Sequence, residues 1–195
     1  MARGPFRVPS AVGTYLQKKR RRGILQIMET EHVSLSIPTA DGVFIAHYSE
    51  KGLCGLNFPS GRKGPGIQLA AHKSQGQIRK WHAATVKALE CVLSGKDPGA
   101  LPPLDFSSGT SFQQRVWQAL LKISCGQTLS YGQVAAAIGN PKALRAVGGA
   151  CGANPIPVLV PCHRVLAANQ RLGGFGGGLT WKRKLLGREG VQWDG

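Results

Sequence analysis

The sequence predicts a mixed α/β chain of the α+β type, in which a small antiparallel sheet with one helix precedes a mostly helical second half. Short apolar runs separated by turn signals fill residues 33–58, which is typical of a meander of strands. Residues 77–93 have the apolar spacing of a helix, and two capping-box motifs follow after residue 109. With 195 residues, 42% of them hydrophobic, the chain is long enough to bury a core.

The first half begins with three predicted strands. Apolar and polar residues alternate over 33–37, and Asp41-Gly42 is a turn signal before two further apolar runs at 43–48 and 53–58. The helix at 77–93 follows, and five of its residues form one face: Ile78, Trp81, Thr85, Leu89 and Val92.

Composition shifts divide the chain into three parts. Residues 1–27 are predicted to be a basic, flexible extension, and its cation run at 18–22 is either a phosphate-binding segment or a solvated tail. Glycine, proline and lysine residues at 60–66 predict a surface loop, and a proline-rich stretch at 97–103 predicts a linker. We therefore expect a first domain at 28–103 and a second at 104–195.

The second half contains the capping boxes. Thr110 and Gln113 begin one helix, because the hydroxyl and the amide can each satisfy a free backbone donor. Ser130 and Gln133 begin another, which is expected to stop at Gly139.

A third helix of the second half is expected directly after that stop. Asn140 is its predicted N-cap, and Pro141 is its predicted first residue. The two short helices would form a helix-turn-helix, a common way to present a helix to DNA, although the same corner occurs in many proteins that do not bind DNA.

Charge and cysteine usage narrow the function classes. Lys and Arg number 25 against 9 Asp and Glu, a net charge of +16, which favours a polyanionic partner such as nucleic acid. No segment has the apolar length of a membrane span, and no apolar signal-peptide core follows the basic N-terminus. The 5 cysteines are widely spaced without a Cys-x-x-Cys pair, so we expect free thiols in a reducing compartment.

The predicted second helix of the pair is poor in side-chain bulk. Residues 143–150 are small or aliphatic apart from Arg145. A reader of the major groove normally carries several long polar side chains. A smooth helix instead permits close approach to the narrow minor groove, with Arg145 entering the duplex where a base has left it. The alternative is an Ala/Gly face packed on another helix, with Arg145 in solvent.

A cysteine beside a histidine follows an apolar segment that is interrupted by prolines. Because the thiolate is the nucleophile, a reactive cysteine needs a base, and His163 could serve Cys162 in that role. Glu189 is a later carboxylate that could orient the imidazole. The alternative is a buried structural cysteine.

These segments together resemble the signature of the O6-alkylguanine-DNA alkyltransferases, also called methylated-DNA–protein-cysteine methyltransferases. The match is dense over roughly 111–190 and holds only in outline before that. It rests on these segments: Tyr131, Asn140-Pro141-Lys142, Arg145-Ala146-Val147-Gly148, Asn154-Pro155, Pro161-Cys162-His163-Arg164-Val165, Gly177-Gly178, Lys182, Leu185, Leu186 and Glu189.

The resemblance implies a fold and a reaction. The first domain would be ribonuclease-H-like and the second winged-helix-like, with the helix-turn-helix and the active site. The protein, expected to be a monomer, would bind the minor groove of double-stranded DNA and flip the damaged base. It would then transfer the alkyl group of O6-alkylguanine, and of O4-alkylthymine, irreversibly to Cys162. The compartment would be the cytoplasm, at the nucleoid, in a bacterium or the nucleus in a eukaryote.

The resemblance also implies roles for single residues. His163 would deprotonate Cys162 through a bridging water, with Glu189 holding the imidazole. Tyr131 would contact a phosphate and donate to the departing purine, and Arg145 would fill the gap in the duplex.

Further residues are assigned to the two surfaces of the site. Asn154 would cap the turn before the active-site strand, and the carbonyls of Cys162 and Val165 would accept from the guanine amino group. The remaining DNA-binding and base-pocket residues are Asn140, Ala143, Ala146 and Gly148, and Phe175, Gly176 and Gly177, respectively.

Two residues depart from the family pattern. Phe175 stands where tyrosine is usual, which keeps stacking but loses a hydroxyl, and Gly176 stands where many members have serine. We therefore hypothesise a roomier pocket that accepts alkyl groups larger than methyl. The cysteines and histidines show no metal-ligand spacing, so no metal and no cofactor are predicted.

Three other classes compete with repair. A DNA-lesion sensor shares the scaffold but lacks the nucleophile, and a cysteine hydrolase has no use for the positive charge. A transcription regulator explains the helices but not Cys162.

Overall fold

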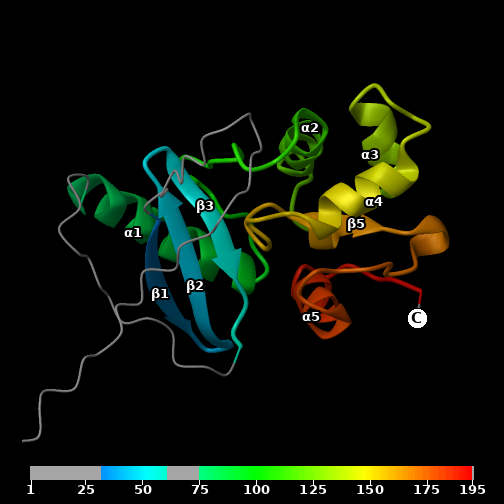
Figure 1. Cartoon of the computed structure of the whole chain (residues 1–195). Helices are drawn as coiled ribbons and strands as arrows, with labels where there is room; N and C mark the ends of the chain where they lie inside the picture. Colours follow the sequence, from blue (N-terminus) through cyan, green and yellow to red (C-terminus); the bar gives the residue numbers. More distant parts are fainter. Residues whose placement is uncertain (1–31, 61–74, 195) are drawn as a thin grey trace, which may run out of the picture.

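The computed structural model describes residues 32–60 and 75–194, and it confirms the predicted α+β fold. A sheet with one helix lies at one side of the molecule, and the remaining helices lie at the other (Figure 1). The predicted extension 1–27 and most of the predicted loop 60–66 lie outside the described residues. The elements of the first half are β1 (Val33–Thr39), β2 (Gly42–Ser49), β3 (Gly52–Asn57) and α1 (Gln75–Leu93). Those of the second half are α2 (Ser111–Leu120), β4 (Leu129–Ser130), α3 (Tyr131–Ala137), α4 (Leu144–Gly152), η1 (Cys162–Arg164), β5 (Val165–Leu166), η2 (Ala168–Gln170) and α5 (Leu179–Arg188).

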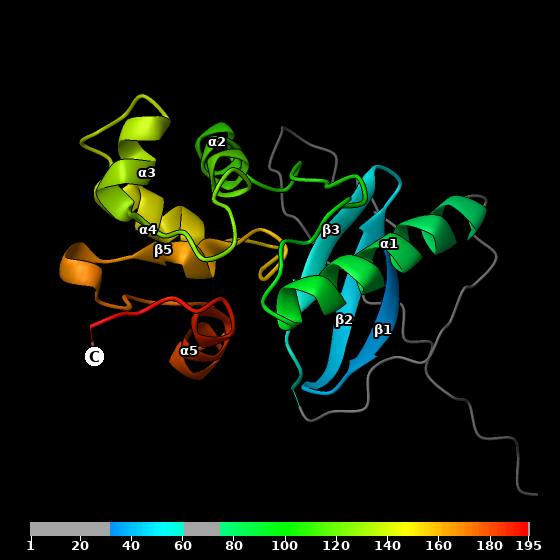
Figure 2. The same ribbon diagram turned by 180° about the vertical axis from the view of Figure 1, so that it is seen from behind.

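The first half is an antiparallel meander in the order β1-β2-β3. Helix α1 covers one face of this sheet, as the view from behind shows (Figure 2). Side chains that alternate along the strands are buried, among them Leu35, Ile37 and Phe44, as their spacing predicts. The Tyr48 hydroxyl donates to Thr85 Oγ1 at 2.9 Å, so a buried polar contact joins β2 to α1.

The chain between the two halves runs along β3. The Leu53 N–H donates to the Pro103 carbonyl at 2.8 Å, and the Asp105 N–H donates to the Leu53 carbonyl at 2.8 Å. The expected domain boundary between 103 and 104 therefore falls in a segment bonded to the first half, and it stays a prediction.

Both predicted capping boxes form. The Thr110 hydroxyl accepts from the Gln113 N–H and the Gln113 side chain accepts from the Thr110 N–H, so α2 begins where its sequence indicates. Ser130 and Gln133 do the same for α3. Gly139 has φ +72°, a left-handed conformation that favours glycine after a helix.

The predicted start of the next helix is wrong. Helix α4 begins at Leu144, and Ala143 rather than Asn140 is its N-cap, without a side-chain hydrogen bond. The Ala143 N–H donates to the Asn140 carbonyl at 3.0 Å, which closes a tight turn. Ala143 then has φ −90° and ψ 27°, away from helical values, so the turn that contains Pro141 does not continue into the helix. The helix-turn-helix is kept, with a longer connection.

One hydrophobic core extends through both halves. The Phe44 ring lies 5.4 Å from that of Trp181 in α5, and the Phe58 ring lies 5.0 Å from it. At the edge of this junction Asp41 pairs with Lys184 at 2.6 Å and with Arg188 at 2.5 Å. Segments from the two halves are therefore held side by side, and the candidate site lies where they meet.

Candidate active site at the junction of the two halves

Cys162 is the first residue of η1, directly after the buried residues 158–161. It is 5% exposed, and it lines an open cavity of ≈ 280 Å³. Residues 56–58 of the first half form one side of this cavity, the end of α4 forms another, and the loop residues 176–177 form a third. The thiol is thus buried but lies in the wall of an accessible pocket, not sealed in the interior.

Asn154 holds the sulfur and the segment that leads to it. Its Nδ2 lies 3.0 Å from Cys162 Sγ and donates to the Val160 carbonyl at 2.9 Å, while its Oδ1 accepts from the Ile156 N–H at 3.1 Å. Burial raises the pKa of the Cys162 thiol to about 11, although the Asn154 donor and the charge of Lys182 act in the opposite direction. At neutral pH the resting group is therefore a thiol.

His163 and Glu189 form a buried pair. The Nε2 atom of His163 lies 2.9 Å from Glu189 Oε1, and the two side chains are 0% and 1% exposed. Burial lowers the pKa of His163, so its resting form near neutral pH is the free imidazole. Among the buried side-chain nitrogen and oxygen atoms of the described residues, its Nδ1 alone has no hydrogen-bond partner. With Nε2–H donated to the carboxylate, Nδ1 keeps a lone pair that can accept a proton.

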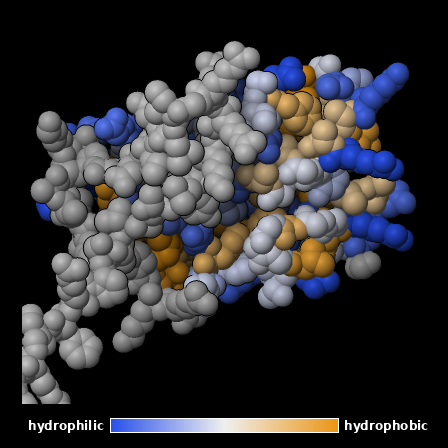
Figure 3. Space-filling model, viewed as in Figure 1, coloured by the Kyte–Doolittle hydropathy of each residue, from blue (hydrophilic) through white to orange (hydrophobic). Residues whose placement is uncertain are grey.

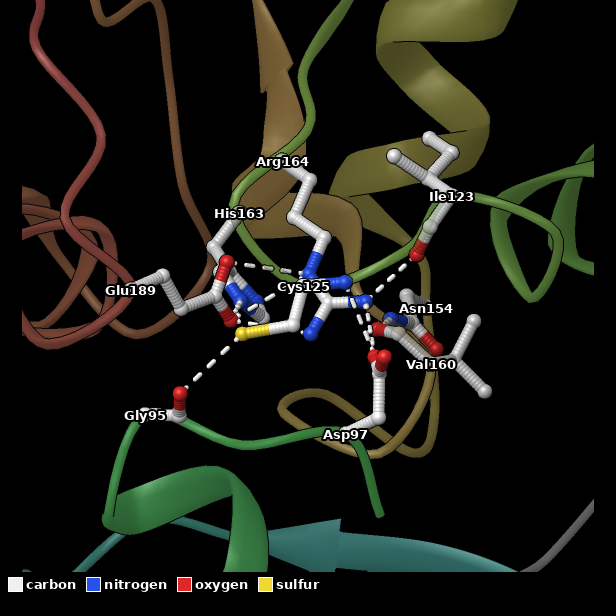
Figure 4. A network of polar contacts seen from close by, with 9 residues as sticks. All are labelled: Gly95, Asp97, Ile123, Cys125, Asn154, Val160, His163, Arg164 and Glu189. Atoms are coloured by element: carbon white, nitrogen blue, oxygen red, sulfur yellow. Dashed lines mark hydrogen bonds and ion pairs between the residues drawn. The ribbon is translucent and has the colours of Figure 1, made fainter. Parts of the chain in front are cut away.

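Arg164 holds the other side of Glu189. Its Nε donates to both carboxylate oxygens at 3.2 and 3.0 Å, and its Nη2 donates to Oε1 at 2.9 Å. Its Nη1 donates to the Ile123 carbonyl and lies 3.6 Å from Asp97 Oδ1 (Figure 4). Burial raises the pKa of Glu189, but the donors of His163 and Arg164 outweigh it and hold the pKa at about 2. The carboxylate is therefore ionised.

Lys182 of α5 is fully buried behind the site. Its Nζ donates to the Val165 carbonyl at 2.7 Å and to the Leu172 carbonyl. Burial lowers its pKa to about 8, while the nearby thiols of Cys162 and Cys151 raise it. The ammonium group thus joins β5 to Leu172, where the glycine-rich loop at residues 172–178 begins.

Tyr131 stands between α4 and the glycine-rich loop at residues 172–178. A Cβ on Gly148 of α4 would lie 3.9 Å from its ring, and a Cβ on Gly173 would lie 3.1 Å from its hydroxyl. Burial raises the pKa of this phenol, so it remains a donor at neutral pH.

Helix α4 connects the outer surface to the cavity. Arg145 and Ala146 are exposed near its start, and Gly152 at its end lines the cavity. The rise of an α-helix places Arg145 about 10 Å along the axis from that end. Strongly hydrophilic side chains project from this half of the molecule, with apolar patches between them (Figure 3).

The remaining predicted site residues do not all reach the cavity. Gly176 and Gly177 line the cavity, whereas Val165 and Phe175 are not among its lining residues. Val165 is fully buried, and the Phe175 ring centroid lies 5.7 Å from that of Phe58. Asn140 and Ala143 lie in the turn before α4. Within residues 32–60 and 75–194, no group of three or more His, Cys, Asp or Glu side chains could hold a metal ion.

The chain is similar to known proteins in both sequence and fold. Residues 111–191 match the sequence model of the family described as "6-O-methylguanine DNA methyltransferase, DNA binding domain". A methylated-DNA–protein-cysteine methyltransferase of Haemophilus influenzae is 55% identical over 83 residues, which are 43% of this chain and 46% of that protein. The regulatory protein ada of Salmonella typhimurium is 38% identical over 177 residues, 82% of this chain and 46% of the relative. The chain thus spans about half the length of these curated relatives.

Among solved structures, Mycobacterium tuberculosis OGT in complex with DNA is similar along most of the chain. Its TM-score is 0.62 at 35% identity, and the match covers 80% of this chain and 91% of that one. The chain belongs to the O6-methylguanine-DNA methyltransferase family. The resemblance found in the sequence is confirmed. Within the described residues, none of the helices has the length and apolar character of a transmembrane span.

Sequence reasoning missed several residues of the candidate site. Residues 56–58 reach the cavity from the first half, and Arg164 holds Glu189. Cys151 lines the same cavity as Cys162, although the two cysteines are far enough apart in sequence to look unrelated. Only Arg164 gave a signal, because a cation within a buried, apolar motif requires a charged partner.

Proposed function

We propose that the protein repairs DNA by direct reversal, moving the alkyl group of O6-alkylguanine irreversibly to Cys162. The observation that carries this proposal is a buried thiol in the wall of an open cavity at the end of α4, with a neutral imidazole beside it in sequence. O4-alkylthymine would be a second substrate, since it presents the same alkyl–oxygen bond.

The reaction begins with removal of the thiol proton. Because the pKa of Cys162 is high in the resting site, the thiolate must form as the substrate reacts. His163 Nδ1 is a suitable acceptor, because it is buried, unpartnered and free of a proton when Nε2–H is held by Glu189. A water molecule between Sγ and Nδ1 would carry the proton, as no direct hydrogen bond joins them. Glu189 then stabilises the imidazolium.

Bond formation and bond breaking occur at one carbon. Sγ attacks the alkyl carbon, the S–C bond forms, and the C–O6 bond breaks with its electron pair moving to the guanine. Charge develops on the purine, and a donor placed there lowers the barrier. The Tyr131 hydroxyl, between α4 and the loop, is the proposed donor.

Access to the thiol requires a base outside the duplex. We propose that α4 lies in the minor groove, where its small exposed residues allow close approach, and that Arg145 occupies the space of the flipped nucleotide. Flipping costs a few kcal/mol, and less for a lesion that pairs poorly. The net charge of +16 supports phosphate contacts, so binding should weaken steeply with added salt.

The product explains why each molecule would act once. S-alkylcysteine is a thioether, and thiol exchange acts on disulfides rather than thioethers. Cys151 in the same cavity therefore cannot regenerate Cys162. We infer a monomer that works in a reducing compartment with DNA, the bacterial cytoplasm or the eukaryotic nucleus.

Intact-protein mass spectrometry after one exposure to O6-methylguanine DNA tests the proposal. We expect one methyl group per molecule, located on Cys162 by peptide mapping, and none in Cys162→Ala. Repeated turnover without a mass change would instead indicate a hydrolase. Binding without transfer would indicate a lesion sensor or a regulator.

A further inference from the structure

Phe58, from the first half of the chain, lines the same cavity as Cys162. It follows β3 directly and is half-buried. Three rings hold it in place: its centroid lies 5.0 Å from that of Trp181, 5.7 Å from that of Phe44 and 5.7 Å from that of Phe175. An aromatic side chain packed on several sides presents a fixed apolar surface to the cavity.

Two neighbouring glycines shape the cavity differently. A Cβ on Gly177 would overlap the Phe58 ring, so this ring occupies the space that a side chain at 177 would need. A Cβ on Gly176 would instead stand 3.6 Å from the Gly152 carbonyl, across the gap between the loop and the end of α4. The missing side chain at 176 thus widens the cavity, while Phe58 fills the room left at 177.

The volume of the cavity indicates whether the Phe58 ring would contact a bound alkyl group or block it. At ≈ 280 Å³ it is close to the lower range of pockets that bind small organic molecules, so it can hold a purine with a substituent. A ring in a cavity of this size is a contact surface rather than an obstruction. Methyl extends a single carbon from O6, whereas benzyl reaches further into the cavity.

We propose that Phe58 is a specificity-determining residue that selects alkyl groups larger than methyl, aromatic ones above all, by packing against them. This inference rests on the proposed transfer to Cys162. Because the ring would contact the distal part of a large group, it accelerates benzyl transfer more than methyl transfer. The first half of the chain therefore supplies part of the substrate pocket.

The test compares transfer rates from DNA carrying O6-benzylguanine or O6-methylguanine, with S-alkylation of Cys162 measured by mass spectrometry. In Phe58→Ala the ratio of benzyl to methyl rates should fall about tenfold, which corresponds to about 1.4 kcal/mol. In Phe58→Leu, which keeps apolar bulk, the ratio of benzyl to methyl rates should fall less. This variant keeps the test valid if Phe58→Ala fails to fold. Phe106→Ala is the matched control, because Phe106 is another half-buried phenylalanine that packs on Trp117 away from the cavity.

The outcomes separate the two proposals. An unchanged or increased ratio in Phe58→Ala, or equal losses on both substrates, overturns the role of Phe58 while transfer to Cys162 stands. Absence of transfer in the wild-type protein overturns the proposed function itself. A ratio that falls equally in Phe106→Ala would also remove the case for Phe58.

Discussion

Replacing Glu189 by glutamine should separate what this carboxylate does for stability from what it does for the reaction. The side chain is 1% exposed and is held between His163 and Arg164. Glutamine has nearly the same shape, and its amide can still contact the imidazole. The main change is the loss of the negative charge, which leaves the Arg164 side chain, 3% exposed, without its buried counterion.

Two independent considerations give the expected decrease in the free energy of unfolding of Glu189→Gln. The interactions lower the Glu189 pKa from 4.5 to about 2, a difference worth about 3 kcal/mol at neutral pH. Removing one partner of a buried ion pair costs about 3–5 kcal/mol, because the other charge stays buried. We therefore expect a loss of about 3 kcal/mol, or roughly 6–12 °C in Tm for a protein of this size.

The pH dependence gives a second measure of the same contact. Because folding lowers this pKa, the stabilisation by Glu189 is fully present above pH 4.5 and is lost as the pH falls toward 2. The wild-type protein should lose stability over that interval, and the Glu189→Gln variant should lose less. Glu90→Gln, an exposed change on α1, is the control for a generic loss of charge.

Denaturant unfolding of Glu189→Gln, Arg164→Met and the double variant completes the test. Each single variant leaves one buried charge unpaired, whereas the double variant leaves none, so it should be more stable than additivity predicts by about 1–3 kcal/mol. Transfer to Cys162 should slow about 100-fold in Glu189→Gln, because the imidazolium loses its counterion. An additive double variant, or a loss below about 1 kcal/mol in the glutamine variant, would refute this reasoning.

Three further predictions concern the cavity, the helix and the junction. Gly176→Ser should narrow the gap toward Gly152 and lower the ratio of benzyl to methyl transfer several-fold; a methyl preference already present in the wild-type protein would contradict the roomier pocket. Arg145→Ala should slow transfer from duplex DNA by about tenfold or more but leave the reaction with free O6-benzylguanine unchanged, and equal slowing would argue against a role in base flipping. Asp41→Asn should lower the free energy of unfolding by about 1 kcal/mol in low salt and less in high salt, since its partners Lys184 and Arg188 are partly exposed.

Local patterns predicted most of the fold, because they depend on neighbours in the sequence. The alternation in β1 and β2 and both capping boxes act over two to four residues, so they can be recognised without the tertiary structure. The prediction of where α4 begins was wrong for a related reason. Asn140-Pro141 is a good local signal for a helix start, but the backbone angles of Ala143 after the turn delay the helix.

The residues of the candidate site were likewise predictable only where the signal lies in the local sequence. The sequence predicted Cys162, His163 and Glu189, and the structure brings His163 and Glu189 into contact across 26 positions. The roles of these residues stay predictions. No pattern could indicate that Phe58 reaches the cavity, because its position depends on how the β-sheet packs against α5.

Burial also sets the resting protonation states of the two groups on which the proposed single-use reaction depends. The same burial raises the pKa of Cys162 and lowers that of His163, so in the resting protein both groups are neutral. A permanently ionised thiolate would be open to any small electrophile that enters the cavity. A neutral pair instead requires a substrate that keeps sulfur, carbon and leaving group aligned while the proton moves to the imidazole. In the proposed reaction, Glu189, held ionised by Arg164 and hydrogen-bonded to the imidazole, would supply the charge that stabilises the imidazolium as it forms.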